Sequence, residues 1–238
     1  MTVFRFKQFA VKQTDSAMKV GTDSVLLGSL VKAKYPKRIL DMGTGTGLLA
    51  LMMAQRFNEA LIDAVEIEEK AFAEATYNAT QSVFSNRIKV VHQSVQEFAQ
   101  TTDEKYDLIV SNPPYYEAEN SFGIQVQNRS HARHTVSLSF DALLESISKL
   151  LSEKGMCWMV LPTMEAERVM AKVAQSGLYC THQIAVHPNP SKAFNRIIFC
   201  LTKTGSDPIR ETFMIKNEQG VYTDSYREVT WPFLLWNK

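Results

Sequence analysis

The stretch Arg38-Ile-Leu-Asp-Met-Gly-Thr-Gly-Thr-Gly47, followed by Leu48-Leu-Ala-Leu-Met-Met-Ala54, decides the fold. A short apolar run, a glycine-rich loop and a second apolar run predict a strand, a turn and a helix. Glycines let the backbone approach a ligand because no Cβ stands in the way, and the start of a helix carries a positive potential. The stretch therefore predicts the first strand–loop–helix unit of an α/β domain, with a ligand at the loop.

The spacing of the glycines separates three kinds of glycine loop. A phosphate-binding P-loop needs Gly-Lys-Ser or Gly-Lys-Thr, and no lysine lies between Gly43 and Gly47. A dinucleotide site favours Gly-x-Gly-x-x-Gly, whose third glycine falls one position beyond Gly47. The chain has Asp41-x-Gly43-x-Gly45-x-Gly47 instead. An acid at the end of the strand would repel a pyrophosphate, and it suits a ligand that carries an ammonium group.

The next apolar run, Leu61 to Ile67, holds Glu66 near its end, 66 − 41 = 25 positions after Asp41. In a nucleotide-binding unit a carboxylate at this place binds the ribose hydroxyls. The alternative is an exposed acid at the end of a strand. We interpret Glu66 as a ribose ligand because the glycine loop precedes it.

A later strand, Tyr106 to Ser111, runs into Asn112-Pro113-Pro114-Tyr115. Two successive prolines cannot donate to a β-ladder, so the strand ends there, at the edge where open α/β sheets bind ligands. The side-chain carbonyl of Asn112 and the backbone carbonyl of Pro113 are acceptors for the two hydrogens of an aromatic amine, and Tyr115 offers a ring for stacking. Two acceptors localise the lone pair on the amine nitrogen. A plain Pro-Pro turn is the alternative.

The rest of the chain continues the alternation of strands and helices. Residues 5–13 predict a short edge strand or hairpin arm, and a helix follows Thr22 and Asp23, either of which is a natural N-cap. Later segments predict helices over 69–84, 139–151 and 164–176 and strands over 88–92 and 156–161. The last two strands, 179–187 and 193–201, have no helix between them and should pair antiparallel. We expect one domain over 1–238, with an N-terminal cap segment (1–37), a core (38–203) and a C-terminal tail (204–238).

Composition sets the class of protein. The 238 residues are 45% hydrophobic and 21% charged, which is ordinary for a globular chain, and the net charge of +1 leaves only a local patch for binding nucleic acid. The sequence shows neither a membrane-spanning run nor a signal peptide. Cys157, Cys180 and Cys200 are dispersed, so we expect reduced core residues, no metal site and a cytoplasmic protein. The sequence sets no oligomeric state.

Two further segments predict contacts with ligands. Ser94, after the strand over 88–92, either hydrogen-bonds an adenine edge or caps the following helix, and both roles are compatible. The polar segment from Tyr116 to Val136 is long for a loop, which favours a function or disorder. It contains Arg129 and Arg133, which we expect to face the substrate.

Together, Asp41-x-Gly-x-Gly-x-Gly47, Glu66 and Asn112-Pro-Pro-Tyr115 resemble the class I S-adenosylmethionine-dependent methyltransferases, and the last motif narrows this to members that methylate amines. Over nearly the whole chain the sequence is similar to the tRNA1(Val) adenine N6-methyltransferases, a match supported by Lys19-Val-Gly-Thr-Asp23 and Asn195-Arg-Ile-Ile-Phe199. The resemblance implies a Rossmann-like α/β fold with a seven-stranded, mostly parallel sheet and an antiparallel final strand.

The resemblance also implies roles for single residues. Asp41 would contact the amino end of S-adenosylmethionine, Glu66 its ribose and Ser94 or Val95 its adenine. The cofactor would further be held by the residues Lys19, Thr22, Asp23, Gly43, Gly45, Gly47 and Asn112. The catalytic loop would be Asn112, Pro113, Pro114 and Tyr115, with no metal ion. The tRNA would bind through Tyr115, Arg129, Arg133, Lys192 and Arg196.

Other functions remain open at this point. A release-factor glutamine methyltransferase uses the same Asn-Pro-Pro-Tyr loop, but it should carry a helical domain ahead of the core, where only about 37 residues stand. Methylation of adenine in rRNA or DNA keeps the chemistry; a DNA enzyme usually needs a separate target-recognition domain. A nicotinamide oxidoreductase is disfavoured by the glycine spacing and Asp41. A non-catalytic RNA-binding module is disfavoured by the intact Asn112 and Glu66.

Overall fold

The computed structural model describes residues 2–14, 19–113 and 139–236. Its centre is a sheet in the order β10-β8-β9-β7-β6-β3-β4-β5. The five strands β5 (Ile88–His92), β4 (Leu61–Glu66), β3 (Arg38–Met42), β6 (Tyr106–Ser111) and β7 (Leu151–Pro162) run parallel to one another. The strand β9 (Arg196–Thr202) is antiparallel to both β7 and β8 (Tyr179–His187). The predicted α/β sheet with its antiparallel late strand is confirmed.

The prediction of seven strands was wrong by one. The segment Ile209–Met214 forms β10, which pairs parallel with β8 at the edge of the sheet. Its first four side chains are exposed, so the segment has no apolar face whose period could reveal a strand. Part of the expected tail is therefore an eighth strand of the sheet, and only its pairing with β8 discloses it.

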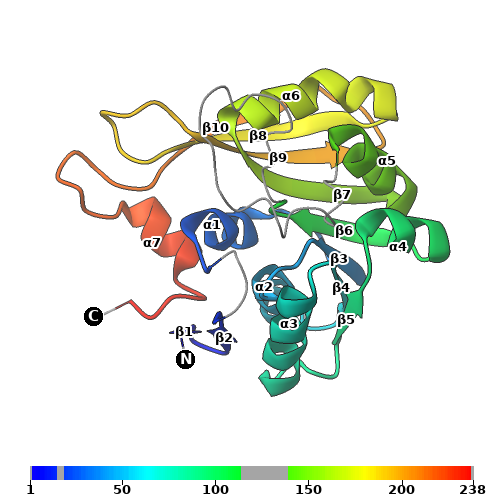
Figure 1. The fold of residues 1–238 in the computed structure, drawn as a ribbon. Coiled ribbons are helices and arrows are strands. Elements are labelled where there is room, and N and C mark those ends of the chain that lie inside the picture. Colours follow the sequence, from blue (N-terminus) through cyan, green and yellow to red (C-terminus); the bar gives the residue numbers. More distant parts are fainter. Residues whose placement is uncertain (1, 15–18, 114–138, 237–238) are drawn as a thin grey trace, which may run out of the picture.

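Helices cover both faces of the sheet (Figure 1). One apolar core joins the sheet to α1 (Thr22–Leu30), α2 (Leu48–Arg56), α3 (Glu69–Gln81) and α7 (Asp224–Thr230). The other lies under α4 (Val95–Thr101), α5 (Phe140–Leu150) and α6 (Thr163–Val173). Ile39 belongs to the first core and Leu40 to the second, as the two-residue period of a strand requires. Both residues are fully buried, which explains the unbroken apolar run of β3.

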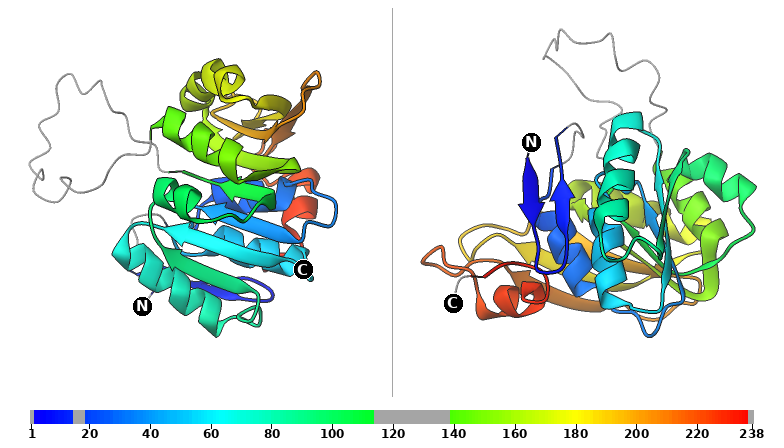
Figure 2. Two further views of the ribbon diagram at one scale, coloured as in Figure 1. Left: turned by 90° about the vertical axis from the view of Figure 1, so that its right-hand side faces the viewer. Right: turned by 90° about the horizontal axis from the view of Figure 1, so that it is seen from below.

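The N-terminal segment forms the hairpin β1 (Val3–Arg5) and β2 (Ala10–Lys12), the second of the two alternatives predicted for residues 5–13, and it lies beside α3 (Figure 2). Asn78 of α3 joins this hairpin to the glycine loop. Its Nδ2 donates to the carbonyl oxygens of Lys12 and Thr46, at 2.9 and 2.8 Å, and its Oδ1 accepts from the backbone N–H of Lys12 at 2.8 Å. These bonds fix the hairpin against the loop.

One local prediction, at the start of α1, fails. Neither Thr22 nor Asp23 caps α1: the N-cap is Gly21, and both residues lie inside the first turn. Near the C-terminus, Trp231 is 51% exposed, whereas Phe233 two positions later is buried. Gly177 ends the helical segment after α6 in the left-handed conformation, with φ of 72°.

Candidate functional site

A cavity opens at the carboxyl ends of β3 and β6, the place where the strand order reverses and where open α/β sheets bind ligands. Segments far apart in the sequence meet there. The lining residues are Lys19, Ser24, Gly43, Thr44, Gly45, Thr46, Leu48, Leu49 and Asn112. Of the residues predicted to bind the cofactor, the structure thus brings together Lys19, Gly43, Gly45 and Asn112. We call this space the loop cavity.

The three glycines of the loop have two different roles. All are in the left-handed conformation, with φ of 68° at Gly43, 57° at Gly45 and 83° at Gly47. A Cβ at Gly43 or Gly45 would meet no atom within 4 Å, so the backbone is bare toward the loop cavity. A Cβ at Gly47 would lie 3.4 Å from the Cα of Ala75 in α3. The first two glycines leave room for a ligand, and the third lets α2 begin close to α3.

Asp41 lies behind the loop and not on the wall of the cavity. It is fully buried; its Oδ2 accepts from the Thr44 hydroxyl and, at 2.9 Å, from the Ala50 N–H. Its Oδ1 is buried without a hydrogen-bond partner in the described part of the chain. Burial raises the pKa of Asp41 to about 7, although the bonds from Thr44 and Ala50 lower it. Asp41 shapes the loop, and its contact with an ammonium group stays a prediction.

Glu66 is held at the end of β4, beside the loop. Its Oε2 accepts from the N–H of Gly45 at 2.8 Å, and its Oε1 accepts from the N–H groups of Ile67 and Glu68, each at 2.9 Å. The side chain is 8% exposed. A carboxylate has about four acceptor positions. The three backbone donors therefore fix the direction of the Glu66 side chain and still leave it able to accept a further hydrogen bond. The carboxylate stands where a ribose ligand is expected, and that role stays a prediction.

Asn112 is buried at the end of β6, and its Nδ2 donates to the hydroxyl of Ser24 at 2.8 Å. Just before it, the hydroxyl of Ser111 donates to the carbonyl of Met42 at 2.8 Å, which ties the ends of β6 and β3 together. The serine in α1 therefore orients the side-chain amide of Asn112. Sequence reasoning missed Ser24, because no local pattern links residues 88 positions apart.

Lys19 and Ser94, two other predicted cofactor ligands, make hydrogen bonds within the protein. Lys19 donates its ammonium to the carbonyl oxygens of Gln13 and Thr14 and so ties the N-terminal segment beside the cavity. Ser94 and Val95 do not line the loop cavity; Ser94 is the N-cap of α4 and forms a capping box with Glu97, which confirms the capping interpretation.

Thr22 and Asp23 line a second cavity together with Lys192 and Arg196, two residues predicted to bind the substrate. The Nε of Arg196 donates to Asp23 Oδ2 at 2.7 Å, an ion pair between residues 173 positions apart. Thr22 and Asp23 therefore face the predicted substrate residues and not the glycine loop. The other predicted substrate and loop residues, Pro114, Tyr115, Arg129 and Arg133, lie outside the described residues.

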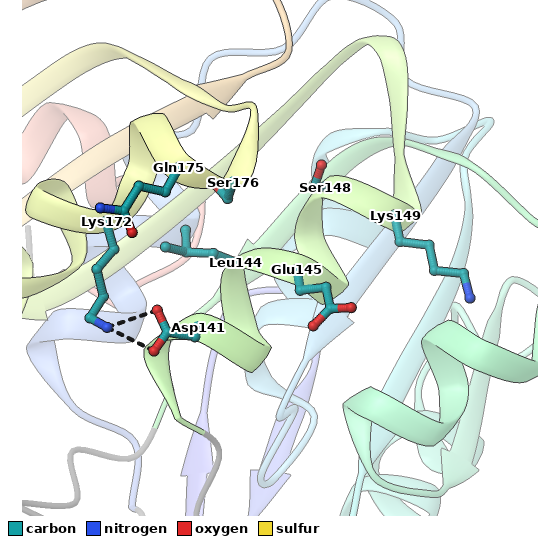
Figure 3. A pocket seen from close by; sticks show the side chains of 8 residues that line it. All are labelled: Asp141, Leu144, Glu145, Ser148, Lys149, Lys172, Gln175 and Ser176. Carbon is teal, nitrogen blue, oxygen red and sulfur yellow. Dashed lines mark hydrogen bonds and ion pairs between the residues drawn. The ribbon is translucent and has the colours of Figure 1, made fainter.

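A third cavity lies between α5 and α6 and is separate from both (Figure 3). Its charges balance, with Asp141 and Glu145 against Lys149 and Lys172, and the ammonium of Lys172 bonds Asp141 at 2.7 Å. We assign no role to it. In the described ranges no three His, Cys, Asp or Glu side chains form a group that could hold a metal ion. None of the described helices is long and apolar enough to span a membrane.

Comparison with known proteins identifies the family. The family model described as "Methyltransferase small domain" matches residues 9–177. A tRNA1(Val) (adenine(37)-N6)-methyltransferase from Pedobacter heparinus is 40% identical, covering 98% of this chain and 97% of that protein. A protein of the same name from Bacteroides thetaiotaomicron is 41% identical over the same shares of the two chains.

Solved structures agree on the fold. A predicted O-methyltransferase from Agrobacterium tumefaciens aligns with a TM-score of 0.68 at 18% identity, covering 91% of this chain and 99% of that one. TrmN from Thermus thermophilus aligns with a TM-score of 0.56 at 20% identity, covering 76% and 48%. The family model spans the glycine loop and Asn112, and the two named relatives each cover 98% of this chain, so the chain belongs to the methyltransferase small domain family and, within it, to the tRNA1(Val) (adenine(37)-N6)-methyltransferases.

Proposed function

We propose that this protein is a cytoplasmic enzyme that transfers a methyl group from S-adenosylmethionine to N6 of an adenosine in tRNA, at position 37, next to the anticodon of a valine tRNA. The observation that carries the proposal is the orientation of Asn112, whose amide is fixed by Ser24 at the wall of the loop cavity. The family adds the identity of the substrate, because its members from Pedobacter and Bacteroides bear that activity in their names.

The glycine loop fits the cofactor, since the bare backbone at Gly43 and Gly45 leaves space that a Cβ would fill. The carboxylate of Glu66, pre-aligned by three backbone donors, would accept from the ribose hydroxyls. Asp41, buried behind the loop with one oxygen that has no hydrogen-bond partner among the described residues, would favour the ammonium end of the ligand. Ser94 and Val95, at the start of α4, would lie toward the adenine. When bound, S-adenosylmethionine supplies a methyl group that its positively charged sulfur makes electrophilic.

Asn112 and Pro113 prepare the amine for attack. Nδ2 of Asn112 is bonded to Ser24, so Oδ1 is the atom of the amide that points the other way. Oδ1 and the carbonyl oxygen of Pro113 would accept the two amine hydrogens, which holds the nitrogen in line with the methyl group. The nitrogen would bond the methyl carbon as the carbon–sulfur bond breaks, and the amine would then lose one proton to water. The adenine would stack on Tyr115, while Arg129, Arg133, Lys192 and Arg196 would bind phosphates.

The test incubates the protein with methyl-labelled S-adenosylmethionine and, separately, total tRNA, total rRNA, duplex DNA and a release factor, and then digests the labelled species. The expected product is N6-methyladenosine in tRNA alone. A valine tRNA transcript with guanine in place of the adenine at position 37 should take up no label. Label in the release factor, rRNA or DNA would contradict the proposal.

Asn112→Ala is the matched variant. It should fold and bind S-adenosylmethionine normally but lose about 10²–10³ in turnover, as when one preorganised polar contact is deleted. Wild-type turnover in this variant at saturating substrate would show that Asn112 does not hold the amine.

A further inference from the structure

The second cavity, of about 410 Å³, lies between the first turn of α1, the connection from β8 to β9 and the segment after β10. We call it the α1–tail cavity. It is lined by Thr22, Asp23, Val186, Pro188, Asn189, Lys192, Asn195, Arg196, Ile215, Lys216 and Tyr222. Its size is in the range of sites that hold small ligands.

Positive charge dominates this cavity, in a chain whose net charge is only +1. Its walls carry the cations Lys192, Arg196 and Lys216 against one carboxylate, Asp23, which Arg196 already engages at 2.7 Å. Within the described residues, no ion pair joins Lys192 or Lys216 to an acid. Two ammonium groups are therefore available to an anionic ligand, unlike in the charge-balanced cavity between α5 and α6 (Figure 3).

The tail holds Lys216 firmly at the wall. The N–H groups of Ile215 and Lys216 donate to the carbonyl oxygens of His187 and Pro188 at 2.9 and 3.1 Å, which extends the pairing of β10 with β8. The ammonium of Lys216 lies 5.0 Å from the centre of the Tyr222 ring, a cation–π contact. The Tyr222 ring in turn stacks on Tyr226, with 4.8 Å between centroids. The position of this cation is thus set before any ligand arrives.

The α1–tail cavity opens at the same edge of the sheet as Asn112. The carboxyl end of β7 pairs with the first residue of the antiparallel β9, in the register Pro162 to Arg196. The carboxyl end of β8 also pairs with the amino end of β9, and Met214, the last residue of β10, pairs with His187, the last residue of β8. On the helix side, Asp23 faces the α1–tail cavity and its neighbour Ser24 bonds Asn112. The first turn of α1 therefore lies between the two cavities and contributes a side chain to each.

We propose that the α1–tail cavity binds phosphate groups of the RNA backbone a few nucleotides away from the adenine held at Asn112. This inference rests on the proposed function and adds to it the site that binds the RNA backbone beside that adenine. The strands β6 and β8 are three sheet spacings apart, about 14 Å, which a polynucleotide chain can bridge in a few nucleotides. Lys192 and Lys216 contact the phosphates, and Tyr222 positions Lys216. The C-terminal segment is thereby part of the substrate site.

The experiment measures binding of a valine tRNA transcript to the full chain across a salt series. For Lys192→Ala and for Lys216→Ala, the slope of log affinity against log salt should fall by about one unit each, while S-adenosylmethionine affinity stays unchanged in calorimetry. Lys216→Arg should keep the slope. Lys34→Ala is the matched control, because Lys34 is exposed and precedes β3, at the opposite edge of the sheet.

The outcomes separate this inference from the function on which it rests. If the wild-type protein methylates tRNA but Lys192→Ala and Lys216→Ala both keep the wild-type slope, the RNA passes elsewhere and the α1–tail cavity is not its site. A fall of the same size in Lys34→Ala would also overturn the inference, since general attraction would then explain the effect. If wild-type protein methylates no RNA, the proposed function itself fails.

Discussion

Ser24→Ala tests whether the hydrogen bond to Asn112 matters for catalysis. The variant removes only the hydroxyl oxygen that accepts from Asn112 Nδ2 at 2.8 Å. Asn112 is 8% exposed, so water replaces the lost acceptor poorly. Losing the partner of a buried polar group costs about 1–3 kcal/mol, and a net hydrogen bond is worth about 0.5–1.5 kcal/mol. We expect the intermediate value of about 1–2 kcal/mol to appear as a roughly 5- to 30-fold slower methyl transfer.

The assay is single-turnover methylation of a valine tRNA transcript at saturating S-adenosylmethionine, with cofactor affinity measured separately because Ser24 also lines the loop cavity. Ser24→Thr, which keeps the hydroxyl, should stay near the wild-type rate. In the double variant, Ser24→Ala should add little to the loss caused by Asn112→Ala, since the two residues act through one bond. The orienting role would be refuted if Ser24→Ala kept the wild-type rate. It would also be refuted if the loss in the double variant equalled the sum of the two single losses.

Three further predictions concern the cofactor site and its loop. Glu66→Ala should weaken S-adenosylmethionine binding by about 1–3 kcal/mol, because hydroxyls lose a charged acceptor; unchanged calorimetric affinity would remove Glu66 from the site. The pKa of Asp41 is raised from 3.8 to about 7, so the folded protein keeps a proton that the unfolded chain has released. Its contribution therefore makes the free energy of unfolding fall by up to about 1.4 kcal/mol per pH unit as pH rises from about 4 to 7. Ligand-free denaturant unfolding at pH 5 and 7.5 should show this dependence reduced in Asp41→Asn, and an equal dependence in both proteins would contradict it. Gly47→Ala should destabilise the fold by more than Gly177→Ala; both have positive φ and share a cost of roughly 1–2 kcal/mol, but only Gly47 is packed against Ala75. Equal losses in denaturant unfolding would mean that this packing is not tight.

The sequence by itself determined the features that short-range physics encodes. Some residues constrain their own backbone: the apolar run of β3, the glycines that follow it and the prolines after Asn112. The strand, the loop and the end of β6 could therefore be predicted from the local sequence. The spacing from Asp41 to Glu66 reflects one strand–helix–strand unit, which sets both acids at the carboxyl ends of neighbouring strands. These local rules sufficed for the fold class and for the strand ends and the glycine loop that border the loop cavity.

Tertiary structure alone decided which distant side chains meet. Ser24 reaches Asn112 and Asp23 reaches Arg196 only because α1 packs across the ends of strands that the chain forms much later. The strand β10 could not be predicted from the sequence for a similar reason. Its mostly exposed side chains show no apolar period, and its position depends on pairing with the edge of β8. Ser94 differs, because its contact is local: its side chain caps α4, three residues from its partner Glu97. The sequence alone was enough to predict that cap. Contacts between residues tens of positions apart depend on sheet order and helix packing, and a linear pattern contains neither.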